Sequence, residues 1–102
     1  MTSTDAENSI QQLLDTLHDL DLSPSAPKMR VVAEHTDERP WGWIVYYQSE
    51  RYLETGDPND MLAGNGPYFV NRETSEMIIT GTALSIEAYV QEYEERLRRD
   101  TQ

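Results

Sequence analysis

Leu62-Ala-Gly-Asn-Gly-Pro-Tyr-Phe-Val70 is the stretch that decides the fold, because it joins a tight turn directly to an apolar run. Gly64 and Gly66 permit backbone dihedral angles that a side chain would forbid. Pro67 fixes its own φ and lacks an amide hydrogen, so it suits the first residue of a strand. Aromatic and β-branched residues follow, as is typical of strands. The stretch therefore predicts a directed turn that feeds a buried strand.

The length and composition of the chain predict one domain over residues 1–102 with a single apolar core. The absence of cysteine excludes disulfides and thiolate chemistry and fits a reducing compartment. The first residues lack the basic and apolar regions of a signal peptide, and no apolar run is long enough to span a bilayer. We expect a cytoplasmic protein without membrane contact.

The acidic residues are distributed unevenly. Nineteen acidic against eight basic residues give a formal net charge of −11. Residues 1–27 carry five acids and no base, and residues 54–66 carry three acids and no base. Such a field repels nucleic acid and speeds the encounter with a basic partner, whereas a purely solubilising role is the alternative.

Hydrophobic periodicity predicts a helix at each end of the chain. Apolar residues recur at helical spacing over about 5–20 and again over about 85–99, where Ser85 is a natural N-cap. A linker at 21–27 follows the first helix. The sheet is expected over about 28–82, with strands at 28–35, 41–47, 67–72 and 76–80, a turn at 36–40, a further strand segment at 49–53 and a long loop at 54–66. The prediction is an α+β fold, with one antiparallel sheet of four or five strands and both helices packed on it.

The segment 41–47 has the strongest β-propensity in the chain, and both of its faces are apolar or aromatic. Simple alternation places Trp41, Trp43, Val45 and Tyr47 on one face, with Ile44 and Tyr46 on the other. A strand of this kind is central or covered on both sides. Gly42, between two tryptophans, predicts a close approach of a neighbouring ring or backbone.

No constellation of residues points to catalysis or to a bound ion. The two histidines lie in different predicted elements, and neither belongs to a recognised motif. Residues 57–60 resemble the start of a calcium loop, but Leu62 replaces the required glycine and Tyr68 the required glutamate. We expect no enzyme activity, no cofactor and no metal.

Several motifs, in order, resemble those of the immunity protein 35 family, which includes YrhB-like proteins. They are Trp-Ile-Val-Tyr-Tyr at 43–47, Tyr-Leu-Glu-Thr-Gly-Asp at 52–57, Leu-Ala-Gly-Asn-Gly-Pro at 62–67, Thr-Ser-Glu at 74–76 and Gly-Thr-Ala at 81–83. Ser75 departs from the pattern, because a glycine is expected in the hairpin. Within the motif, Trp43, Gly64, Asn65, Gly66 and Pro67 are expected to have structural roles.

The resemblance implies a small α+β protein that binds a cognate bacterial toxin in the producing cell and occludes its active or substrate-binding surface. The toxin is expected to present a basic surface to the acidic segment. A chaperone-like holding protein and an acidic mimic of nucleic acid are the alternatives. Candidate contact residues are Glu54, Asp57, Asn59 and Asp60, with Tyr46, Tyr47 and Tyr52 as aromatic anchors. Ordinary packing against the sheet is the alternative role for each tyrosine.

Overall fold

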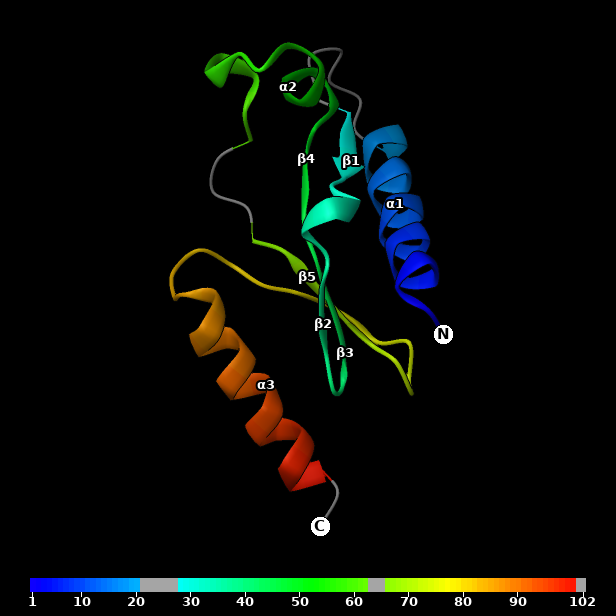
Figure 1. Cartoon of the computed structure of the whole chain (residues 1–102), viewed down its shortest axis with the longest axis vertical. Helices are drawn as coiled ribbons and strands as arrows, with labels where there is room; N and C mark the ends of the chain where they lie inside the picture. The colour runs from blue at the N-terminus through cyan, green and yellow to red at the C-terminus, as the bar shows by residue number, and fades with distance from the viewer. Residues whose placement is uncertain (21–27, 63–65, 101–102) are drawn as a thin grey trace.

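The computed structural model describes residues 1–20, 28–62 and 66–100. Figure 1 shows a central sheet with a long helix on either side. The elements, in chain order, are α1 (Ser3–Leu20), β1 (Met29–Val31), the short 3-10 helix η1 (Ala33–His35), β2 (Asp37–Arg39), β3 (Gly42–Val45), β4 (Tyr47–Ser49), α2 (Glu50–Thr55), η2 (Pro58–Asp60), β5 (Tyr68–Asn71), β6 (Met77–Ile79) and α3 (Ile86–Asp100). The α+β class is confirmed. The predicted linker 21–27 and residues 63–65, including Gly64 and Asn65, lie outside the described residues.

The predicted single sheet is instead two antiparallel sheets. Four strands pair in the order β2-β3-β5-β6, and β1 pairs with β4 in a separate two-stranded ladder. The cause is η1, which takes up three residues between β1 and β2, so that these strands pair with successive parts of the 42–49 segment. A hydrogen bond of 2.9 Å from the Val32 amide to the Tyr46 carbonyl bridges the junction.

Four local predictions were wrong. The expected loop at 54–66 contains the end of α2 and the short helix η2. The segment 28–35 is a strand only over Met29–Val31, and the expected turn at 36–40 contains β2. The expected strand at 49–53 is the start of α2, because the Ser49 hydroxyl accepts a hydrogen bond from the Tyr52 amide and caps the helix. Gly56 ends α2 in the left-handed conformation, with φ 70°.

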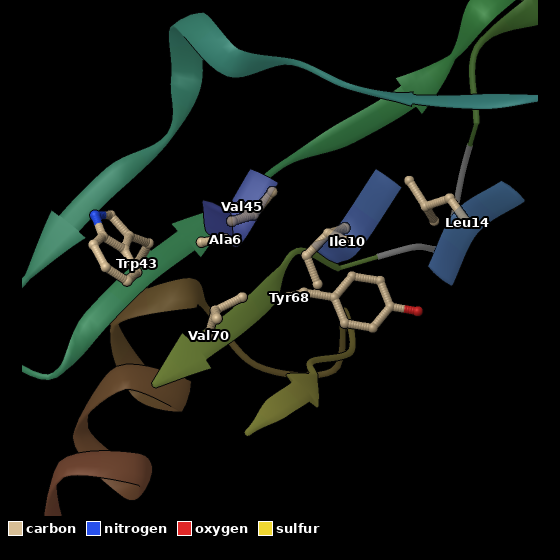
Figure 2. Packing of buried hydrophobic residues seen from close by; sticks show 7 residues of the cluster. All are labelled: Ala6, Ile10, Leu14, Trp43, Val45, Tyr68 and Val70. Atoms are coloured by element: carbon tan, nitrogen blue, oxygen red, sulfur yellow. The ribbon is translucent and has the colours of Figure 1, made fainter. Parts of the chain in front are cut away.

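The core has two parts, one on each face of the four-stranded sheet. Figure 2 shows the first, where α1 packs on β3 and β5. The second lies under α3 and, within the described residues, comprises Trp41, Ile44, Phe69, Val90 and Tyr93. Strand β3 is therefore covered on both faces, as its composition predicts. Trp41 lies on the face opposite Trp43, however, which corrects the simple alternation.

The β5–β6 hairpin turn contains a strained residue. Ser75 has φ 63°, and its amide donates to the Asn71 carbonyl at 2.9 Å. A left-handed conformation costs about 1–2 kcal/mol for a residue with a Cβ, whereas glycine adopts it freely. A glycine, which the resemblance leads us to expect in this hairpin, would suit the backbone conformation at position 75.

We expect Ser75→Gly to stabilise the protein by about 0.5–1 kcal/mol, because relief of the left-handed strain exceeds the added entropy of the unfolded chain. Urea unfolding followed by tryptophan fluorescence measures the difference. Ser75→Ala is the control, since it removes the hydroxyl but keeps the Cβ, and it should bring no gain. A Ser75→Gly variant less stable than the wild type would contradict this account of the turn.

Candidate functional site

A segment formed by α2 and η2, which we call the acidic lobe, carries four of the predicted contact residues: Glu54, Asp57, Asn59 and Asp60. Figure 1 shows this segment at one end of the molecule, above the β1–β4 ladder. Local capping builds it. Gly56 terminates α2, and the Asp57 carboxylate accepts the Asn59 amide at 3.0 Å to cap η2. Pro58 follows at the first position of η2, where its missing amide hydrogen is harmless.

The acidic groups of the lobe differ in their surroundings. The half-buried Asp60 carboxylate lies 3.5 Å from Arg51 Nε and accepts the Thr55 hydroxyl at 3.2 Å. Glu54 and Asp57 are exposed, and neither forms an ion pair within the part of the chain that the structure describes. The exposed negative charge of the lobe therefore comes from Glu54 and Asp57, of which Asp57 also caps η2, while Asp60 is engaged by Arg51 and Thr55.

An apolar cleft of about 440 Å³ begins where the acidic lobe ends, and we call it the tyrosine cleft. Met61 and Leu62 directly follow η2 and line it, together with Tyr46 and Tyr47. The Gln48 side chain accepts the Leu62 amide at 2.6 Å and ties this lining to β4. The remaining lining residues are Gln48, Gly66, Pro67, Gly81, Thr82, Leu84, Ser85 and Ile86. The cleft is thus assembled from three segments that are distant in the sequence.

Two of the three predicted tyrosines, the sequence neighbours Tyr46 and Tyr47, both line the cleft. Tyr46 packs partly against the α3 part of the core, and the Tyr47 ring lies 5.6 Å from the Tyr68 ring on the other face. Both remain partly accessible at the cleft, whereas Tyr52 lies half-buried on α2 and does not line it. Burial, with a smaller contribution from the Asp37 carboxylate, raises the pKa of Tyr46.

The motif residues expected to have structural roles are buried where the structure describes them. Trp43 is 2% exposed and belongs to the core under α1, and Gly66 and Pro67 are buried beside the cleft. The Pro67 carbonyl accepts both the amide and the hydroxyl of Thr80, at 3.1 and 2.6 Å. These contacts are with the protein's own backbone and core.

Sequence reasoning missed the apolar part of this surface. Met61 and Leu84 are about half exposed and both line the cleft. The available signal was the pair Met61-Leu62 within an otherwise polar loop. Leu84 and Ile86 carried no such signal, because they flank Ser85, the predicted N-cap of the last helix, and reach the cleft only through the tertiary fold.

No site for metal chemistry is found in the described ranges 1–20, 28–62 and 66–100, where no three His, Cys, Asp or Glu side chains converge. Over the same residues, no helix is both long and apolar enough to cross a bilayer. The described surface carries the acidic lobe beside the tyrosine cleft.

The fold and this surface define a small α+β protein whose described candidate site is suited to contact with a protein. The model of the family described as Immunity protein 35 matches residues 4–96. The chain belongs to the immunity protein 35 family.

A curated relative has the printed description "Uncharacterized protein YrhB" and comes from Escherichia coli (strain K12). It is 40% identical over 53 residues, which cover 52% of this chain and 56% of the relative. The match thus spans about half the length of each protein. No solved structure matches this chain.

Proposed function

We propose that this protein is an immunity protein that binds a cognate bacterial toxin in the cytoplasm and occludes its active or substrate-binding surface. The observation that carries the proposal is the continuity of the acidic lobe with the tyrosine cleft, in a chain of the immunity protein 35 family. Binding and steric occlusion, without catalysis, are the mechanism. The toxin is expected to present basic side chains beside an apolar one.

The two parts of the surface have different roles in this mechanism. Exposed carboxylates at Glu54 and Asp57 attract a basic partner from a distance and increase the association rate. The cleft then receives an apolar side chain, and Tyr46 and Tyr47 provide aromatic contact area and hydroxyl donors. Charge sets the association rate and its salt dependence, while cleft contacts set the lifetime of the complex.

We expect the double reversal Glu54→Lys/Asp57→Lys to weaken toxin binding by about 10–100-fold at low salt, mainly through a slower association. The difference from the wild type should shrink as the salt concentration rises, because screening removes the long-range attraction. Association kinetics at several salt concentrations, together with a thermal melt to verify folding, measure both effects.

Glu34→Lys/Glu73→Lys is the matched control for this experiment. Both side chains are exposed, and they lie on η1 and at the β5–β6 hairpin, away from the acidic lobe. The control changes the net charge by the same amount and should bind close to the wild-type rate. Equal losses of toxin binding in the two double variants would mean that the lobe acts only through the overall negative charge of the protein. Unchanged toxin binding by Glu54→Lys/Asp57→Lys would show that the acidic lobe is not part of the interface.

A chaperone-like holding role is the second candidate, and exposed apolar residues on α1 favour it. Leu17 and Leu20 are 43% and 72% exposed near the C-terminal end of this helix. A holding protein would suppress the aggregation of several unrelated unfolded proteins, and Leu20→Lys would reduce that activity. An immunity protein would bind its folded toxin with Leu20→Lys as well as with the wild type.

A further inference from the structure

The outer edge of β6 is open within the described part of the chain. Strand β6 pairs with β5 alone. The bonds from the Thr80 amide to the Pro67 carbonyl and from the Asn71 amide to the Glu76 carbonyl fix the alternation of the ladder. By this alternation, the main-chain groups of Ile78 face β5, and those of Met77 and Ile79 point away from the sheet.

The side chains at this edge are apolar and accessible. Met77 and Ile79 are 42% and 64% exposed. They stand opposite Val70 and Tyr68 in the register, and so on the face of the sheet that α1 covers further along. The contacts of α1 with the strands concentrate on β1 and β3, which leaves the β6 end of this face uncovered.

The opposite edge of the same sheet is protected. Strand β2 consists of Asp37, Glu38 and Arg39, and these side chains form ion pairs. Charged residues on an edge strand are a common device that prevents pairing with another chain. Strand β6, with the sequence Met-Ile-Ile, has no such device.

A groove of about 540 Å³ runs between β6 and α3 beside this edge. Phe69, Ile78 and Tyr93 provide apolar lining, and the charged lining residues are Glu92, Glu95, Arg96 and Arg99. Two acids and two bases give this lining no net charge, in a chain whose formal net charge is −11. A basic toxin gains little attraction here, whereas a second copy meets little repulsion and can oppose acidic with basic groups across a two-fold axis.

We propose that a second copy of this chain pairs with β6, antiparallel and centred on Ile78, to extend the four-stranded sheet across a two-fold axis. In this register Met77 of each copy exchanges main-chain hydrogen bonds with Ile79 of the other copy. The exposed Met77 and Ile79 side chains of the two copies then cover one another on the same face. Dimerisation goes beyond the proposed toxin binding, because the acidic lobe and the tyrosine cleft do not include β6.

Sedimentation equilibrium over a concentration series tests the proposal. The wild type should approach twice the 11.8 kDa of one chain by ~200 µM, a range suited to a short interface. Ile79→Lys should weaken the association at least tenfold, because the side chain is exposed in the monomer and covered in the dimer. Ile79→Pro removes an amide hydrogen that points away from β5, and it should also weaken the association.

Leu20→Lys is the matched control, since it introduces the same charge at another exposed apolar residue, and it should dimerise as the wild type does. Amide exchange gives an independent readout: protection at Met77 and Ile79 should rise with protein concentration. A wild type that stays monomeric throughout the series overturns the proposal. So does an Ile79→Lys variant that dimerises like Leu20→Lys. Toxin binding by a monomeric Ile79→Lys variant would show that the two interactions are separate.

Discussion

Gly42→Ala should destabilise the protein by roughly 3–6 kcal/mol, combining the costs of backbone strain and overpacking. Gly42 has φ 154°, and a Cβ placed there would lie 1.9 Å from the Val70 carbonyl oxygen. The obstacle is backbone on the central strand pair, so no side-chain rotation can relieve it. A loss of this size is a large part of the 5–15 kcal/mol that typically stabilises a domain.

The same glycine explains the arrangement of the two tryptophans. In a regular strand Trp41 and Trp43 would share a face, but Trp41 packs at 4.8 Å from the Tyr93 ring under α3, and Trp43 packs under α1. The unusual φ of Gly42 rotates the chain between them. Gly42→Ala should therefore disturb both parts of the core, and tryptophan fluorescence during urea unfolding will report it.

Gly56→Ala is the control for this prediction. Gly56 also has a positive φ, at 70°, but a Cβ there would meet no atom within 4 Å. Its expected cost is the left-handed strain alone, about 1–2 kcal/mol. If Gly42→Ala were no more destabilising than Gly56→Ala, the close approach of β3 to the Val70 backbone would be refuted.

Gly66→Val is expected to cost roughly 2–4 kcal/mol of folding free energy, in the upper range for overpacking a buried site. A Cβ at Gly66 would lie 2.5 Å from the Gly81 carbonyl oxygen and 2.5 Å from Thr80 Oγ1. The substitution would therefore separate the 66–67 segment from the strand end at Thr80. The loss of stability should come first, and toxin affinity should fall as a consequence, because Gly66 packs on backbone and also lines the tyrosine cleft.

Gly81→Ala provides the comparison on the other side of this contact. Its Cβ would meet only the hydroxyl end of Tyr89, at 3.0 Å, and a side chain can move where a backbone cannot. A much smaller loss of stability is expected. A Gly66→Val variant that keeps its melting temperature yet loses the toxin would reverse the roles assigned here to the motif and the acidic lobe.

The parts of the fold that follow from the sequence are those in which local pattern and tertiary burial agree. The α1 residues Ala6, Ile10 and Leu14 recur at helical spacing, and all three are buried. The Ser85 hydroxyl accepts the Ala88 amide at 3.2 Å, so the predicted start of α3 is confirmed. The aromatic and β-branched runs of β3 and β5 pair as central strands.

The wrong predictions concern short segments with weak or conflicting local preferences. Asp37-Glu38-Arg39 has little β-propensity and is a strand because it pairs with β3. Tyr52 and Leu53 favoured a strand, but they lie in a helix that Ser49 caps at its start and Gly56 ends. Both capping residues could be recognised in the sequence, and their preference for helix ends had more effect than the β-propensity of Tyr52 and Leu53.

The candidate site was predictable only in part. The charge distribution in the sequence pointed to Glu54, Asp57 and Asp60, and in the structure these residues lie in α2, at the N-cap of η2 and in η2. The tyrosine cleft is different, because its walls come from Tyr46 and β4, from residues 61–62 and 66–67, and from the segment 81–86 that leads into α3. Only the folded chain brings Leu84 to Tyr46, and no local pattern encodes that proximity.

Titration of the purified cognate toxin with this protein, with toxin activity and heat of binding measured on the same samples, tests the central claim most directly. We predict a one-to-one complex with a dissociation constant in the nanomolar range or below, typical of preorganised inhibitory complexes, and loss of toxin activity in proportion to complex formed. Binding should weaken with added salt. Toxin that stays fully active when saturated with this protein, or no complex at micromolar concentrations, would contradict the claim.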